Sequence, residues 1–174
     1  MNNNYTALVL IPLACLLIAG VWYYWPSQAI DPSFRADEVV ITKSQHRLTL
    51  KKDGKTVKNY RISLAFNPRS RKVCDGDGRT PEGTYYVTRK SSSTKYSKTI
   101  DFSYPNGEDR RRAREEGCDP RERIMIHGLP HNLSWLGPFH RPFMWTDGNI
   151  MLSDSDMDEL QQAIPSATLI MIYP

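Results

Sequence analysis

The feature that most constrains the fold is the pair Asp53-Gly54, which lies between two runs of alternating apolar and polar residues. The runs cover 47–51 (RLTLK) and 55–66 (KTVKNYRISLAF). A two-residue type I′ turn needs positive φ at both central positions, and Asp-Gly is among the pairs that adopt it most readily. The sequence therefore predicts a β-hairpin, and with it a sheet that the rest of the chain must extend or cover.

Short strands continue along the chain. They are predicted at 38–43, 84–90, 99–104, 123–126, 149–152 and 168–173, where β-branched and aromatic residues stand between turn residues. Ser153 to Ile164 carries the strongest helix signal, because Ser153 can cap the first turn and Asp156 lies three residues on. A charged helix is predicted at 108–116. The pattern indicates a mainly β (α+β) fold, a sandwich-like sheet with one or two short helices.

The N-terminal run Tyr5 to Trp25 is apolar and uncharged. At about 1.5 Å per residue it is long enough to span a hydrocarbon core of about 30 Å. We expect a transmembrane signal-anchor within 1–29, a linker at 30–37 and one domain at 38–174. A cleaved signal peptide is the alternative, because Ser27-Gln28-Ala29 offers small residues where a signal peptidase reads.

The formal net charge of +4 is spread through the domain. Its one dense basic run, 110–114 (RRRAR), is followed by two glutamates, as is typical of a solvated helix face. No nucleic-acid motif accompanies the run, so we expect no nucleic-acid partner.

The chain has three cysteines. Cys15 lies within the apolar N-terminal run, which leaves Cys74 and Cys118 in the domain. In an exported protein these two could form one disulfide, but two cysteines alone leave a disulfide and free thiols equally open.

Chemically capable side chains gather between Ile124 and Leu160, a stretch that holds three of the four histidines. His127 follows an apolar strand and precedes Gly128, so its imidazole is expected at a sheet end beside a bend. It could serve there either as a base or as a packed structural histidine.

Two other kinds of site have less support in the sequence of this stretch. His131 and His140 follow His127 at a spacing that could suggest a metal site, but no matched Cys or Glu ligands support it, and we expect no metal. A Ser-His-Asp arrangement would use Ser134 or Ser153 with Asp147. No Gly-x-Ser-x-Gly signature supports it.

Four motifs closely resemble the L,D-transpeptidase catalytic domain (YkuD-type). They are GDGRTPEGTYYV (76–87), SYPNGEDRRRA (103–113), IMIHGLP (124–130) and WTDGNIMLSDSDMDEL (145–160). The resemblance runs from about Val39 to Pro174. It implies an L,D-transpeptidase-like β-sandwich that acts on peptidoglycan stem peptides without a cofactor. It also implies a place at the inner membrane or cell envelope, with the domain facing the periplasm or cell wall.

In that family a Cys thiolate attacks the amide between an L- and a D-centre, and the resulting acyl-enzyme is passed to an amine or to water. The resemblance implies that His127 is the base. The family's nucleophile lies in an S/T-x-G-C turn, which reads Thr146-Asp147-Gly148-Asn149 here. The implied catalytic positions are His127, Asn149, Gly148 and Asp147, and the implied substrate-binding positions are Gly128, Trp145 and Thr146.

Asn149 therefore stands where the family has its nucleophilic Cys, and Met151 stands where the family often has an Arg. Thiol catalysis needs a pKa of about 8.5 lowered by a neighbouring His, whereas an amide neither ionises near neutral pH nor forms an acyl intermediate. We expect a membrane-tethered, catalytically impaired or inactive relative that binds stem peptides or an envelope protein. One alternative is an active transpeptidase or peptidoglycan hydrolase with another nucleophile, such as Cys74 or Cys118. The other is a purely structural domain.

Overall fold

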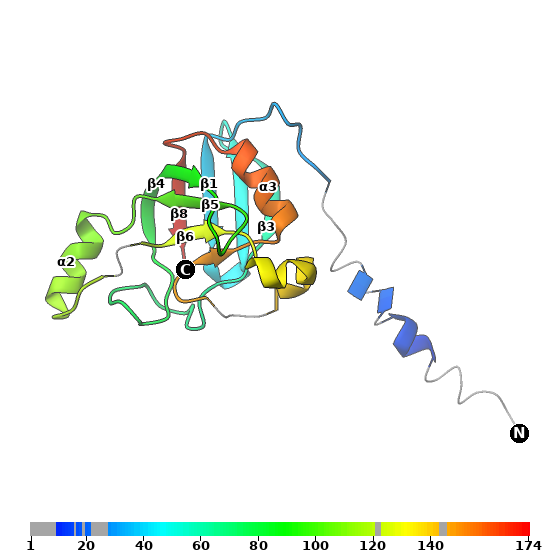
Figure 1. The fold of residues 1–174 in the computed structure, drawn as a ribbon, viewed down its shortest axis with the longest axis horizontal. Helices are drawn as coiled ribbons and strands as arrows, with labels where there is room; N and C mark the ends of the chain where they lie inside the picture. Colours follow the sequence, from blue (N-terminus) through cyan, green and yellow to red (C-terminus); the bar gives the residue numbers. More distant parts are fainter. Residues whose placement is uncertain (1–9, 16, 19, 22–27, 121–122, 143–145) are drawn as a thin grey trace, which may run out of the picture.

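The computed structural model describes residues 10–15, 17–18, 20–21, 28–120, 123–142 and 146–174. In this part of the chain, eight strands form one sheet in the order β3-β2-β1-β8-β4-β5-β6-β7 (Figure 1). The strands are β1 (Glu38–Thr42), β2 (Arg47–Lys52), β3 (Lys55–Arg61), β4 (Gly83–Ser91), β5 (Thr99–Phe102), β6 (Met125–His127), β7 (Ile150–Met151) and β8 (Leu169–Tyr173). The helices are α2 (Gly107–Glu115) and α3 (Asp154–Ala163), with 3₁₀ segments η1 (Lys43–Gln45) and η2 (His131–His140).

The predicted hairpin is confirmed. Asp53 and Gly54 have φ of 49° and 72°, and Lys52 pairs with Lys55 across the turn between β2 and β3. The predicted strand 55–66 ends at Arg61, however, because the chain beyond it leaves β2 and pairs elsewhere.

That second pairing closes the sheet. The Ser63 N–H donates to the Met151 carbonyl and the Met151 N–H donates to the Ser63 carbonyl, each at 2.9 Å. The sheet is mixed, because β1–β8 and β6–β7 are parallel while the other strand pairs are antiparallel. The result is a folded-over mixed sheet with a few helices.

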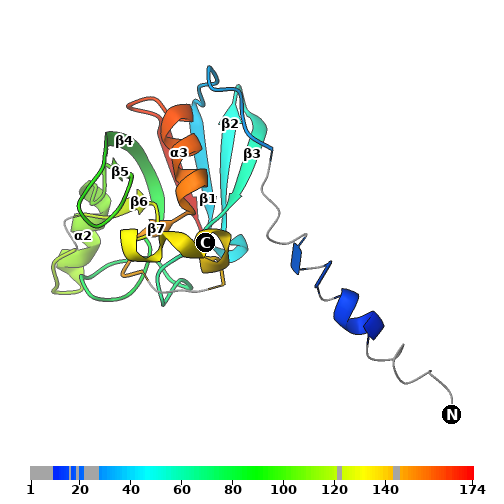
Figure 2. The same cartoon turned by 45° about the vertical axis from the view of Figure 1, so that its right-hand side comes forward.

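Helix α3 lies between the two halves of this sheet (Figure 2). The Ser153 Oγ accepts from the Asp156 N–H and caps its first turn, as the sequence predicts. Met157, Leu160 and Ala163 are buried on one face. The helix ends before Pro165, which cannot continue it.

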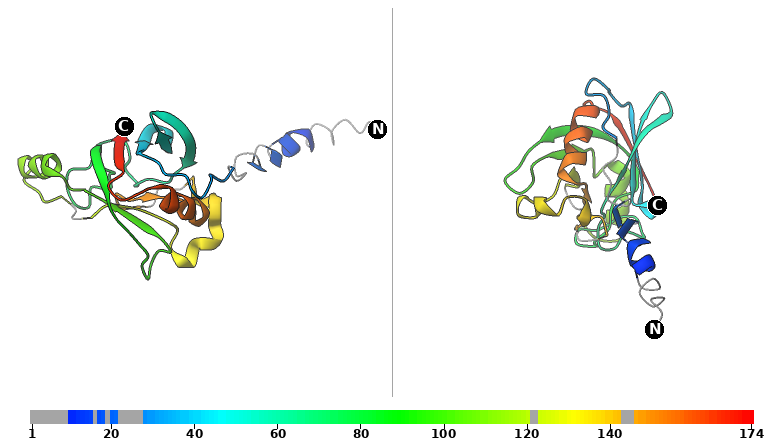
Figure 3. Two further views of the ribbon diagram at one scale, coloured as in Figure 1. Left: turned by 90° about the horizontal axis from the view of Figure 1, so that it is seen from above. Right: turned by 90° about the vertical axis from the view of Figure 1, so that its right-hand side faces the viewer.

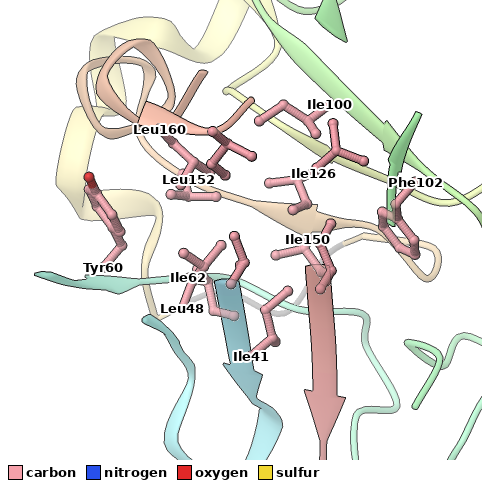
Figure 4. Packing of buried hydrophobic residues seen from close by; sticks show 14 of the residues in the cluster. Ile41, Leu48, Tyr60, Ile62, Ile100, Phe102, Ile126, Ile150, Leu152 and Leu160 are labelled. Carbon is pink, nitrogen blue, oxygen red and sulfur yellow. The ribbon is translucent and has the colours of Figure 1, made fainter. Parts of the chain in front are cut away.

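The core joins both halves of the sheet to α3. In Figure 4, Ile41 and Leu48 from β1 and β2 face Ile126 and Ile150 from β6 and β7, and Leu160 of α3 packs above them. Each of these five side chains is fully buried. Burial of such a side chain is worth about 1.5–3 kcal/mol, so this cluster holds β6 and β7 firmly in place.

Helix α2 and segment η2 lie at opposite ends of the domain (Figure 3). Asn106 caps α2 in a complete capping box with Asp109, which explains why so polar a helix begins there. At the other end, η2 leads from β6 back toward β7 and adjoins α3.

The segment before β1 packs against the domain. The Ile30 N–H donates to Glu159 of α3 at 2.9 Å, and the Ala36 N–H donates to the Ala163 carbonyl at 2.8 Å. The expected anchor at 1–29 lies largely outside the described residues. Among those that are described, no helix is long and apolar enough to cross a membrane.

Candidate functional site

The site is built on the parallel pair β6–β7. His127 lies opposite Met151 in the register, and Asn149 lies two residues before Met151. His127 and Asn149, the residue just before β7, both line the same cleft. The Met125 N–H donates to the Asn149 Oδ1 at 3.1 Å, which fixes the Asn149 side chain against β6.

His127 is an uncharged base in this structure. Its Nδ1 lies 2.6 Å from the Gly128 carbonyl oxygen. A carbonyl can only accept, so Nδ1 carries the proton and Nε2 keeps its lone pair. The pKa of His127 is lowered to about 4, chiefly because burial disfavours the charged ring, and the Gly128 carbonyl opposes that shift. The Nε2 atom has no hydrogen-bond partner among the described residues.

The β4–β5 connection forms the second wall of the site. The Tyr96 ring stacks on His127, with centroids 4.0 Å apart and planes inclined by 30°. The Lys95 Nζ lies 5.3 Å from the Tyr96 centroid, and the Lys95 carbonyl accepts from the His131 N–H at 3.1 Å. Neither Lys95 nor Tyr96 has a recognisable signal in the sequence, because both lie in a polar loop without a motif and reach His127 only through the tertiary fold.

The turn before β7 has a backbone that requires glycine. Gly148 has φ of 89°, and a Cβ there would lie 2.7 Å from the Ile124 Cδ1 and 3.0 Å from the Arg79 carbonyl oxygen. The Thr146 Oγ1 donates to the Asn149 carbonyl at 2.6 Å and closes the turn. This turn therefore aims position 149 at the cleft whichever side chain stands there.

Asp154, the first residue of α3, holds the other side of the site. Its Oδ1 accepts from the Leu129 N–H and from the Ser97 Oγ, each at 3.0 Å. A Cβ at Gly128 would collide with the same oxygen. Asp154 thus ties the bend after His127 to the β4–β5 connection. Its place in the first turn of α3 was the one sequence signal for it.

Together these elements enclose a cleft of about 270 Å³. Its lining residues are Lys95, Tyr96, His127, Pro130, Leu133, Thr146, Asp147, Asn149 and Met151. The structure thus brings together four of the residues that the sequence assigned to a site, namely His127, Thr146, Asp147 and Asn149. Gly128 and Gly148 shape the adjoining backbone, and Trp145 lies outside the described residues.

The other candidate groups lie elsewhere. His131 is exposed, and the buried His140 has its Nδ1 2.6 Å from the Gly137 carbonyl oxygen. In the described ranges, no three His, Cys, Asp or Glu residues come together to hold a metal ion. The Ser134 Oγ donates to a backbone carbonyl, and Ser153 is the α3 cap, so neither hydroxyl is directed at His127.

The cysteines supply no thiol to the cleft. Cys74 and Cys118 form a disulfide with Cα atoms 5.7 Å apart, and Cys15 stands in the N-terminal run. The chain has only these three cysteines. The alternative nucleophiles considered from the sequence are therefore oxidised.

The mixed sheet thus presents a buried histidine beside a glycine-containing turn. The family model of the YkuD L,D-transpeptidase catalytic domain matches residues 36–172. This chain belongs to that family. A search of curated proteins found no match.

Solved structures share the fold. The helical cell shape determining protein Pgp2 from Campylobacter jejuni is 24% identical with a TM-score of 0.59, over 80% of this chain and 48% of that one. Bd1075 from Bdellovibrio bacteriovorus is 18% identical with a TM-score of 0.57, over 83% and 50%. An L,D-transpeptidase from Mycobacterium smegmatis is 14% identical with a TM-score of 0.53, over 80% and 59%. The chain thus spans about half the length of these proteins.

Proposed function

We propose that this chain is a membrane-tethered L,D-transpeptidase-family protein of the cell envelope that binds peptidoglycan stem peptides without forming an acyl-enzyme. The observation that carries the proposal is Asn149, an amide, in the same cleft as the neutral base His127 in a domain without a free thiol.

In this proposal, the acyl-transfer reaction of the family stops at its first step, the attack of a nucleophile on the substrate amide. His127 has a lone pair ready to take a proton, but the Asn149 amide releases none near neutral pH, and its Oδ1 already accepts from Met125. Without a nucleophile there is no acyl intermediate. Removal of a covalent nucleophile lowers the rate by several orders of magnitude and leaves only binding and electrostatic stabilisation.

The preserved cleft supports ligand binding over a purely structural role. The positive φ of Gly148 and the Asp154 contacts to the bend after His127 both shape the walls around an open cavity. The Nε2 of His127 is buried without a hydrogen-bond partner among the described residues, which a domain kept only for its fold would have no reason to retain.

The proposed location is the inner membrane, with the domain facing the periplasm or cell wall. The apolar run 5–25 is long enough to act as the tether. The Cys74–Cys118 disulfide supports an oxidising compartment, because such bonds persist mainly in exported proteins.

The test uses the full-length protein in detergent, with a synthetic stem tetrapeptide and a carbapenem. We expect calorimetry to detect peptide binding, and mass spectrometry to find neither peptide turnover nor a carbapenem adduct. Peptide turnover or a covalent adduct on the unmodified protein would refute the non-catalytic proposal. Absence of peptide binding would refute the ligand-binding part and favour the structural alternative.

A further inference from the structure

The Asn149 side chain has a fixed orientation in the cleft. The Met125 N–H must find an acceptor, so the oxygen of the amide faces β6. The Nδ2 group is then the end that remains for a ligand, and Asn149 lines the cavity. Position 149, which the resemblance assigns to the family's nucleophile, therefore presents hydrogen-bond donors here.

Lys95 adds a positive charge to the same cleft. Its side chain is exposed, and its ammonium makes no ion pair with any described residue. Other lysines of the domain bind a carboxylate at 2.7–2.8 Å: Lys43 with Glu82, Lys58 with Glu159, Lys72 with Asp77, and Lys98 with Asp158. Lys95 thus differs from these lysines in lining a cavity with an aromatic ring, and not a carboxylate, beside its ammonium.

An ammonium and an amide N–H₂ together call for a ligand oxygen with negative charge. Asp147 also lines the cavity and His127 is uncharged there, so the formal charges of Lys95 and Asp147 cancel and the positive charge is local to Lys95. One carboxylate suits this balance better than a doubly charged phosphate. At about 270 Å³, the cavity accommodates the end of a peptide but not a folded partner.

We propose that the cleft binds the free C-terminal carboxylate of a peptide, with Lys95 supplying the charge and the Asn149 amide donating a hydrogen bond. This inference rests on the proposed function, since it assigns the part of the stem peptide that the site holds. The protein then recognises a stem that ends at the cleft, which is what amide hydrolysis elsewhere leaves behind, instead of an intact amide awaiting attack.

The experiment compares two synthetic stem tetrapeptides, one ending in a carboxylate and one in a carboxamide, by calorimetry on the full-length protein in detergent. We expect the carboxylate form to bind about tenfold more tightly, which corresponds to about 1.4 kcal/mol. Lys95→Gln is expected to abolish this preference. Lys55→Gln, an exposed lysine at the start of β3, is the matched control and is expected to retain it.

Asn149→Asp is the sharpest variant, because it keeps an oxygen for Met125 and replaces the donor group with an acceptor that carries charge. It is expected to prefer the carboxamide. Acetate should displace the carboxylate peptide at lower concentration than inorganic phosphate does.

The outcomes separate the two proposals. Equal binding of both peptides, an unchanged preference in Lys95→Gln, or stronger displacement by phosphate overturns the carboxylate site and leaves the proposed function standing. Absence of binding by either peptide overturns both.

Discussion

The end of β6 and the turn before β7 meet in one cleft, but they differ in what matches the family motif. In the first it is a side chain, and in the second it is the backbone. The end of β6 keeps what a general base requires, namely a buried, uncharged His127 with a defined tautomer. The turn keeps its backbone, with Gly148 at positive φ and Thr146 bonded to the Asn149 carbonyl, while the side chain at its end is an amide. The turn is held by the packing of Gly148 and by a bond to the backbone of Asn149, neither of which involves the side chain at position 149. Its geometry therefore does not depend on which side chain stands there.

The largest expected effect comes from Asn149→Cys, which would place a thiol in the same cleft as the imidazole of His127. A thiol at this position would line the same cleft as His127, whose Nε2 has no hydrogen-bond partner among the described residues and could accept a proton. We expect acylation by a carbapenem to rise by about 10³-fold or more, followed by mass spectrometry of the intact protein. Asn149→Ala should stay unlabelled, and His127→Ala added to Asn149→Cys should suppress the gain. If Asn149→Cys folds but is not acylated, the turn no longer aims position 149 correctly.

Gly148→Ala tests whether the turn is held by packing. The added Cβ meets positive φ and two close atoms, so we expect a loss of about 2–4 kcal/mol in the free energy of unfolding, measured in urea. Gly117→Ala is the matched control, because Gly117 also has positive φ (69°) but nothing lies within 4 Å of its Cβ position. That control should lose about 1 kcal/mol. Equal losses would show that packing adds nothing at Gly148.

The pH dependence of the free energy of unfolding tests whether His127, at the end of β6, is buried and neutral. The folded protein holds the pKa of His127 at about 4, below the unfolded value of 6.5, so the unfolded state binds more protons between these values. Stability from this group is therefore complete above pH 6.5 and is lost as pH falls toward 4, by up to about 3 kcal/mol. His140, whose pKa burial also lowers, contributes in the same direction. Urea unfolding at several pH values should show that the free energy of unfolding changes less with pH in His127→Gln than in the unmodified protein. An unchanged pH dependence in His127→Gln contradicts a buried neutral ring.

The smallest expected effect concerns Asp154, which holds the bend that follows His127 at the end of β6. Asp154→Ala removes the acceptor of the Leu129 N–H and the Ser97 Oγ, so we expect a loss of about 1–3 kcal/mol in urea unfolding. Asp158→Ala, which removes a half-exposed pair with Lys98, should change stability by about 0–1 kcal/mol. A loss in Asp154→Ala no larger than in Asp158→Ala would show that Asp154 does not support the bend.

Short-range sequence signals predicted much of the secondary structure. The hairpin at Asp53-Gly54 and the cap of α3 at Ser153 depend on neighbours within a few residues, and both are confirmed. The strand predicted to reach residue 66 was wrong beyond Arg61, because the bridge from Ser63 to Met151 draws the chain to a distant partner. Alternation predicts a strand but does not say what the strand pairs with.

The sequence by itself determined which residue occupies each position of the family motifs, and the resemblance assigns Asn149 to the nucleophile position and His127 to the base position. Only the tertiary structure decided what surrounds them. It stacked Tyr96 on His127, brought Lys95 to the cleft, joined Cys74 to Cys118 and directed the Asn149 oxygen to Met125. The physical reason is that a motif specifies only which residues follow one another over a short stretch of the chain. Burial, charge and hydrogen-bond direction depend on contacts between segments that lie far apart in the chain.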